Sequence, residues 1–188
     1  MTLLYILLAV AALVVIMVVV LFNALVAKRN MVNNGWADID VQLKRRADLI
    51  PQLVTTVQGY AQHEQTLFEE VIERRNAALH AGDDPSVRGT MESELSRPVS
   101  KLLALAEDYP DLKASDNFLE LQTQLSETEN KIEMARRFYN GAVRELNIGV
   151  QSFPGNIVAG TFGFEARRFF EITMADRAVP KIDLGGTQ

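Results

Sequence analysis

Residues 116–153 read DNFLELQTQLSETENKIEMARRFYNGAVRELNIGVQSF, with apolar or small side chains spaced alternately three and four apart. This spacing predicts one α-helix with a heptad-like seam over about five repeats. Ser115 or Asp116 is a suitable N-cap, and Phe153-Pro154-Gly155 ends the pattern, which gives a helix of about 50 Å. The seam contains small and polar positions, so it suits close packing in a bundle. Its members are Phe118, Leu121, Leu125, Thr128, Ile132, Ala135, Tyr139, Ala142, Leu146, Gly149 and Phe153.

The N-terminus is a second decisive stretch, because Leu3–Phe22 is a run of twenty residues without a charge. Twenty helical residues span about 30 Å, the hydrocarbon thickness of a bilayer. A cleaved signal peptide is the alternative, but it needs a basic start, a shorter apolar stretch and a small-x-small cleavage site. Only Met1 and Thr2 precede the run, so we expect an uncleaved transmembrane anchor within residues 1–27.

Basic residues follow this anchor and none precedes it. Residues 23–46 contain Lys28, Arg29, Lys44, Arg45 and Arg46 against two acidic residues. The positive-inside bias favours an N-terminus outside and the rest of the chain in the cytoplasm. The opposite orientation stays open, since only Lys28 and Arg29 flank the span directly. The five basic residues either contact anionic lipid headgroups or only determine this topology.

About 160 residues follow the anchor, which is enough for one domain with a core. The whole chain has a formal net charge of −5, and residues 47–188 carry 14 basic and 22 acidic residues, a net −8. An acidic domain is unsuited to nucleic-acid binding. The chain contains no cysteine, which excludes disulfides, thiolate metal sites and a cysteine nucleophile.

The segments between the anchor and residue 116 also indicate helices. Residues 33–47 carry an apolar face that can continue the transmembrane helix. Asp48 resembles an N-cap with Pro51 in the first helical turn, so we expect a break at Ala47-Asp48 and then a helix to about Ala78. A loop at 80–85 precedes a helix over about 86–108.

Two prolines and the C-terminal region complete the prediction. Pro98 is expected to start, kink or split the third helix, and Pro110 to end it. After residue 153 we expect one or two short helices, an extended stretch at 180–184 and a disordered tail at 185–188. The fold class is therefore all-α: a transmembrane helix, an antiparallel bundle of about four long helices, and a short helical tail.

The search for chemistry gives little. His63 and His80 have no metal-binding partners at helical spacing, and no nucleophile, phosphate or dinucleotide motif is present. The sequence therefore predicts no catalytic residue, no cofactor and no metal. Four phenylalanines in the tail are candidates for an oligomer or membrane-interface contact, although a cap over the end of the bundle is the preferred interpretation: Phe162, Phe164, Phe169 and Phe170.

Several phrases resemble one known family in order and spacing. They are FNALVAKRN (22–30), Trp36, IDVQLKRR (39–46), DLIPQLV (48–54), GYA (59–61), AEDYPDLKA (106–114), TEN (128–130) and ARRFYN (135–140). Together they resemble the LemA family over nearly the whole chain. The resemblance implies a single N-terminal transmembrane helix in a bacterial inner membrane and a bundle of long helices, here 28–184. It implies no established biochemical activity.

Three functional hypotheses follow. The leading one is a non-catalytic, membrane-anchored scaffold that self-assembles, with membrane lipids, further copies and other envelope proteins as partners. The second is an envelope enzyme or accessory subunit with a site in a groove of the bundle. The third is a lipid-responsive or membrane-remodelling protein that uses the basic residues and the phenylalanine-rich tail.

Overall fold

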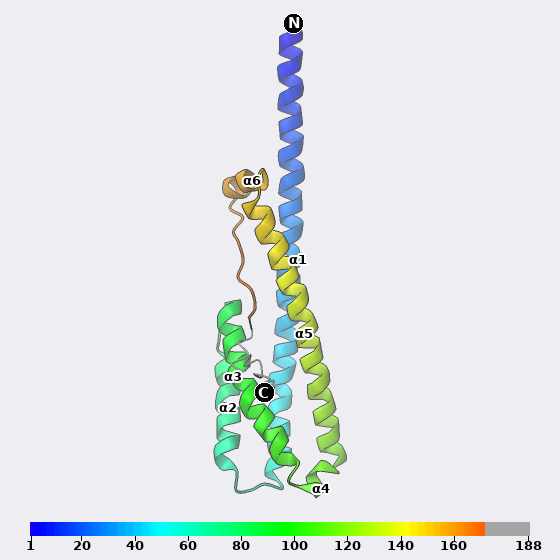
Figure 1. Ribbon diagram of the computed structural model, residues 1–188, viewed down its shortest axis with the longest axis vertical. Helices are drawn as coiled ribbons and strands as arrows, with labels where there is room; N and C mark the ends of the chain where they lie inside the picture. The colour runs from blue at the N-terminus through cyan, green and yellow to red at the C-terminus, as the bar shows by residue number, and fades with distance from the viewer. Residues whose placement is uncertain (172–188) are drawn as a thin grey trace, which may run out of the picture.

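The computed structural model describes residues 1–171, which contain helices and no strand. This confirms the all-α fold class (Figure 1). Four of the helices are long, as expected for the bundle, and two are short. The helices are α1 (Thr2–Gln58), α2 (Gln65–Leu79), α3 (Pro85–Ala106), α4 (Pro110–Lys113), α5 (Asp116–Gln151) and α6 (Gly155–Phe162).

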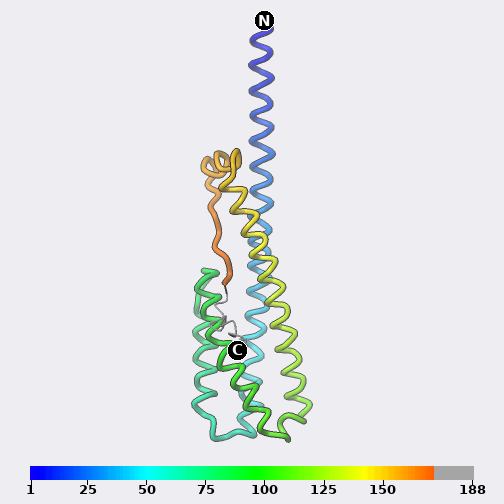
Figure 2. The backbone as a smooth tube through the Cα atoms, viewed as in Figure 1, coloured from blue at the N-terminus to red at the C-terminus, as the bar shows by residue number. Residues whose placement is uncertain are grey.

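The molecule is an elongated bundle around α1, as the backbone trace in Figure 2 shows. Helix α5 runs antiparallel to α1 along most of the bundle, while the α2–α3 hairpin covers only the part of α1 far from the N-terminus (Figure 1). The core accordingly has two parts. One lies among α1, α2, α3 and the start of α5, and the other lies among α1, the end of α5, α6 and the chain after α6.

Helix α5 agrees closely with its sequence prediction. Ser115 is the N-cap and the helix ends at Gln151. Phe153 is 79% exposed, so the expectation that it closes the seam is wrong; the helix has ended before it, and Phe153 lies in the turn before α6. The seam positions that are buried as expected are Phe118, Leu121, Leu125, Thr128, Ile132, Tyr139, Ala142 and Leu146.

The expected break at Ala47-Asp48 is wrong, because α1 is continuous from Thr2 to Gln58 with Pro51 inside it. A proline in a helix has no N–H to offer the carbonyl four residues earlier. Here the Nε of Arg75, from α2, donates to the Ala47 carbonyl oxygen at 2.6 Å. A neighbouring helix thus supplies the hydrogen bond that Pro51 cannot make.

The next boundaries also differ from the prediction. The expected single helix to Ala78 is wrong, because the chain turns at 59–64 between α1 and α2, and buries Ala61 there. Pro98 lies inside an uninterrupted α3, so it neither starts nor splits the helix. Asp84 begins α3 instead, and its carboxylate accepts hydrogen bonds from the backbone N–H groups of Ser86 and Val87. The predictions for 180–184 and 185–188 lie outside the described residues.

Candidate functional site

The N-terminal part of α1 has the length and composition of a membrane span. Its most apolar window has a mean hydropathy of 3.3, and none of that window is buried against the rest of the protein. This one helix fits a single-pass membrane protein. It passes residue 27 without interruption, and Leu25 is already buried in the bundle core. The anchor and the bundle therefore share one helix.

Lys28 and Arg29 are the first charged residues after the apolar run. Lys28 contacts α5, and Arg29 contacts the chain that follows α6. The Nζ of Lys28 is 3.4 Å from a Glu145 carboxylate oxygen and donates to the Glu145 carbonyl at 3.0 Å. The Arg29 guanidinium lies 5.0 Å from the centre of the Phe164 ring, a cation–π contact. Both basic groups are partly exposed at the level where α1 leaves the apolar run.

Lys44, Arg45 and Arg46 lie farther along α1. Lys44 follows Phe22 by 22 residue steps, which rise about 33 Å along a straight helix, a distance longer than the headgroup layer. Lys44 and Arg45 are exposed, but Arg46 is only 3% exposed. The expectation that Arg46 contacts lipid headgroups is therefore wrong, because its guanidinium group is buried inside the bundle.

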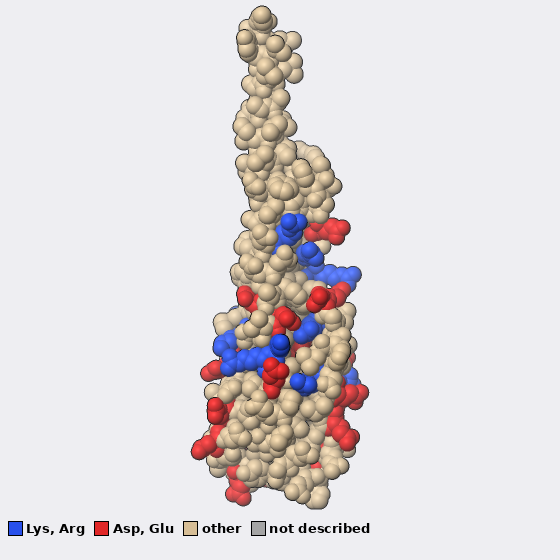
Figure 3. Space-filling view, turned by 180° about the vertical axis from the view of Figure 1, so that it is seen from behind, with Lys and Arg blue, Asp and Glu red and all other residues tan. Residues whose placement is uncertain are grey.

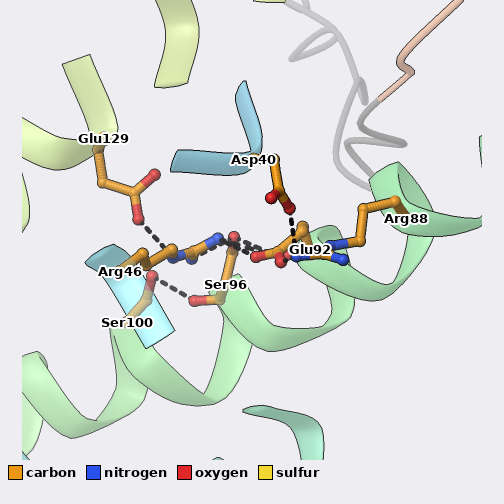
Figure 4. Close-up of polar contacts among 7 residues, drawn as sticks. All are labelled: Asp40, Arg46, Arg88, Glu92, Ser96, Ser100 and Glu129. Atoms are coloured by element: carbon orange, nitrogen blue, oxygen red, sulfur yellow. Dashed lines mark hydrogen bonds and ion pairs between the residues drawn. The ribbon is translucent and has the colours of Figure 1, made fainter. Parts of the chain in front are cut away.

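Arg46 is the centre of a buried ionic network that joins three helices (Figure 4). It contacts Glu92 of α3 at 3.1 Å and Glu129 of α5 at 2.8 Å, and donates to the Ser96 hydroxyl at 2.8 Å. Arg88 continues the network, at 3.5 Å from Glu92 and 3.5 Å from Asp40 of α1. Two arginines thus face three carboxylates, of which only Glu92 is fully buried.

Burial raises the pKa of the Glu92 carboxyl above its ordinary value, because removal from water disfavours the charged form. The positive charges of Arg46 and Arg88 oppose this shift, and the negative charge of Glu129 adds to it. Within residues 1–171, the buried Nε atoms of Arg46 and Arg88 make ion-pair contacts with Glu129 and Glu92 but no hydrogen bond, so the network is held mainly by charge attraction. Its geometry indicates a structural clamp among α1, α3 and α5.

The chain after α6 returns along α5 as an extended segment, residues 164–171, which we call the strap (Figure 1). Two asparagines of α5 hold its backbone. Asn140 accepts from the N–H of Phe170 at 2.9 Å and donates to its carbonyl at 3.1 Å. Asn147 makes the same pair of bonds to Arg167, at 2.8 and 2.9 Å.

The spacing of the two asparagines explains why they match the strap. Seven helical residues rise about 10.5 Å, and three extended residues span about 10 Å. Asn140 and Asn147 therefore meet Phe170 and Arg167 in register. Gly163, with φ 71°, turns the chain from α6 into the strap. Gly89 of α3 permits the end of the strap to approach α3 closely, since a Cβ on Gly89 would lie 2.2 Å from the Glu171 carbonyl oxygen.

The four tail phenylalanines have different environments. Phe170 is fully buried and its ring contacts Trp36 at 5.9 Å, and Phe164 is 6% exposed beside Phe22. Phe162 and Phe169 are 50% and 39% exposed. Phe164 and Phe170 therefore belong to the core, which agrees with the interpretation of a cap, while Phe162 and Phe169 keep exposed surface.

A cavity of about 390 Å³ lies beside the strap, between the start of α3 and the α1–α5 pair. Its wall combines Trp36 and Tyr139 with charged groups from two loops, of which Arg168 and Asp84 form an ion pair at 2.8 Å. The Tyr139 hydroxyl donates to the Arg168 carbonyl at 2.9 Å, and burial raises its pKa. One acidic and one basic group of the wall, Asp84 and Arg168, thus pair with each other.

The histidines give no metal centre in the described part of the chain. His63 lies in the turn between α1 and α2, so its expected position in the middle of a helix is wrong. The Nδ1 of His80, at the end of α2, is 2.7 Å from the Asn76 carbonyl oxygen. Within residues 1–171, no three acidic or histidine side chains gather as metal ligands would.

Sequence reasoning missed the residues that join the helices. Arg88, Glu92 and the asparagine pair carry no local motif, and their partners on other elements lie 20 to 48 residues away in the chain. The one available signal was the seven-residue spacing of Asn140 and Asn147 on the side of α5 away from the seam.

Comparison with known proteins identifies the relatives of the chain. It is 22% identical over 175 residues to magnetosome protein MamQ 2 of Paramagnetospirillum magneticum, which covers 80% of this chain and 64% of that protein. It is 26% identical over 137 residues to protein LemA of Metamycoplasma hominis, covering 73% and 63% respectively. The chain thus spans just under two thirds of the length of these relatives. The sequence model of the LemA family matches residues 35–184, and the chain belongs to the LemA family.

Proposed function

We propose that this protein is a non-catalytic, membrane-anchored scaffold of the bacterial cell envelope that assembles with copies of itself. The observation that carries the proposal is α1, because one helix forms both the apolar span and the central element of the bundle. Such a continuous helix connects the membrane rigidly to the bundle, which suits a scaffold. Relatives named as magnetosome proteins support this class of function.

The proposed location is the inner membrane, with the N-terminus outside and the bundle in the cytoplasm. The basic residues Lys28 and Arg29 follow the span directly, as the positive-inside bias requires. Their partly exposed side chains are suited to anionic lipid headgroups. The acidic bundle below them is suited to protein partners, including other envelope proteins, and not to nucleic acid.

The outer face of α5 supports self-association. Met134, Phe138 and Ile148 are 57%, 50% and 50% exposed, and they fall on one stripe of the helix. Gly141 lies on the same stripe, and a Cβ there would meet no atom within 4 Å. The Phe138 ring also lies against Gly35 of α1, so Met134 and Ile148 offer the freer surface on which a second copy can pack.

The test is the oligomeric state of the full chain in lipid nanodiscs extracted directly from membranes, measured by native mass spectrometry. We expect a defined assembly, and Met134→Asp should shift it toward monomer, because Met134 is 57% exposed on this stripe. Leu119→Asp is the matched control, because Leu119 is 45% exposed at the other end of α5. A monomer under all conditions would contradict the proposal, as would equal effects of the two variants.

A further inference from the structure

The end of the bundle that faces the anchor is apolar and exposed. Phe153, Ile157 and Phe162 are 79%, 61% and 50% exposed, and they flank or belong to α6. The chain contains no charged residue between Glu145 and Glu165. Figure 3 shows the same division on one face, where charged side chains appear only below the apolar upper part of the molecule. An exposed apolar surface of this kind is typical of a site that contacts a membrane or another protein.

Helix α6 lies beside the last turn of the apolar run. The rings of Phe22 and Phe162 are 4.9 Å apart, centre to centre. Val18, Leu21 and Phe22 pack against the core that contains Val158 and Ala159 of α6. All residues from Met1 to Met17 are exposed. The apolar run is therefore divided into a free part that ends at Met17 and a part covered by α6.

The length of the free part determines where the bilayer must end. Thr2–Met17 contains 16 residues, which rise about 24 Å and are shorter than a hydrocarbon core of about 30 Å. Leu3–Phe22 as a whole rises about 30 Å. If the hydrocarbon core covers the whole run, its boundary lies at Phe22. Residues 18–22, which lie beside α6, rise about 7.5 Å, so α6 would lie up to that depth inside the boundary. Interfacial helices lie about 5–10 Å deep.

We propose that α6 and the preceding turn form a membrane foot that inserts into the bilayer interface beside the anchor. Its ligand is the lipid acyl-chain boundary, contacted by Phe153, Ile157 and Phe162. Figure 1 shows α6 lying crosswise at the end of α5, the orientation of a helix in the plane of a membrane. Lys28 and Arg29 then lie at the headgroups. This inference rests on the proposed membrane anchoring and adds a second attachment to it.

The absence of cysteine allows a direct measurement of depth. Single cysteines are introduced into the full chain as Ile157→Cys, Val10→Cys and Val41→Cys, labelled with a nitroxide, and reconstituted in vesicles of phosphatidylcholine and phosphatidylglycerol. Electron paramagnetic resonance then compares collisions with oxygen, which enters the bilayer, and with a water-soluble nickel chelate. Val41 is the matched control, because it has the same 61% exposure as Ile157 but lies in the bundle.

We expect the ratio of oxygen to nickel accessibility at 157 to be several-fold higher than at 41, and closer to the ratio at 10. A ratio at 157 equal to that at 41, with a high ratio at 10, would overturn the membrane foot while leaving the anchor intact. Low accessibility to both reagents at 157 would assign the surface to a protein contact and would also overturn it. A low ratio at 10 would overturn anchor and foot together.

Discussion

Arg46 connects three helices through one guanidinium group, and its removal tests how far the bundle depends on that connection. Arg46→Met leaves the buried Glu92 with only Arg88, at 3.5 Å. Breaking a buried ion pair costs about 3–5 kcal/mol, so the free energy of unfolding should fall by that amount. Denaturant unfolding of the full chain in detergent micelles, followed by circular dichroism, measures it.

The control for this prediction is Arg74→Met. Arg74 pairs with Glu94 at 2.7 Å, but the side chains are 45% and 43% exposed. An exposed pair contributes about 0–1 kcal/mol because water screens it. A loss in Arg46→Met no larger than that in Arg74→Met would show that the network contributes little to stability.

Glu92 also makes stability depend on pH. Burial raises its pKa in the folded protein above the unfolded value near 4.5. Above that value the unfolded chain releases the proton while the folded protein retains it, so the free energy of unfolding falls as pH rises through the window up to the folded pKa. Glu92→Gln should remove this decline, which denaturant titrations from pH 4.5 upward would detect. A wild-type decline that persists in Glu92→Gln would assign it to other groups.

At the scale of the helix, α1 depends on α2 for its continuity at Pro51. Arg75→Met should leave the Ala47 carbonyl without its 2.6 Å partner and cost about 1–3 kcal/mol of unfolding free energy. In a Pro51→Ala background the new N–H can bind that carbonyl, so the same substitution should cost less. A double-mutant cycle measures this coupling, and additive effects would contradict it.

The strap gives a second prediction at this scale. Asn140→Ala with Asn147→Ala removes four hydrogen bonds to its backbone. Each is worth about 0.5–1.5 kcal/mol, and every 1.4 kcal/mol is tenfold in an opening equilibrium, so trypsin should cleave at Arg167 and Arg168 about 10-fold faster or more. Asn130→Ala, on an exposed turn of α5, should leave cleavage unchanged. Equal cleavage of all three proteins would contradict the proposed role of the asparagines.

These elements differ in how well the sequence predicts them. Helix α5 was predictable because its cap, its seam and its terminating proline are all local signals. The break expected at Ala47-Asp48 was wrong because Arg75, the residue that compensates for Pro51, lies on another helix. The turn between α1 and α2 was missed because apolar residues at helical spacing occur on both sides of it: Leu49, Leu53, Val57, Leu67 and Val71. Periodicity reports which face is buried, and it contains no signal for a reversal of direction.

The candidate site was less predictable than the fold. The basic residues after the anchor look equivalent in sequence, yet Lys28 lies beside the apolar run and Arg46 lies inside the bundle. Whether a charge is buried depends on partners such as Glu92 and Glu129, which are brought to it only by the packing of three helices. The tail phenylalanines divide in the same way, since Phe170 of the strap is buried in the core and Phe162 is half exposed.

At the scale of the molecule, the continuous helix predicts an upright protein. Residues 23–58 of α1 contain 36 residues and rise about 54 Å beyond the apolar run. Atomic force microscopy of the full chain in supported bilayers should therefore show protrusions of about 50 Å. Heights near the width of two or three packed helices, about 20–30 Å, would indicate a bundle lying on the membrane instead.

The uninterrupted α1 also fixes how the bundle is rotated, about the helix axis, relative to the apolar run. Successive residues of a helix are about 100° apart, so the azimuth of each anchor side chain sets the azimuth of each side chain in the bundle. Neighbouring copies whose anchors touch through one side must present one defined side of their bundles to each other. Deleting a single residue from the free part of the anchor turns that side by about 100°. In the proposed assembly, the contacts between copies would therefore depend partly on the helical register of the apolar run.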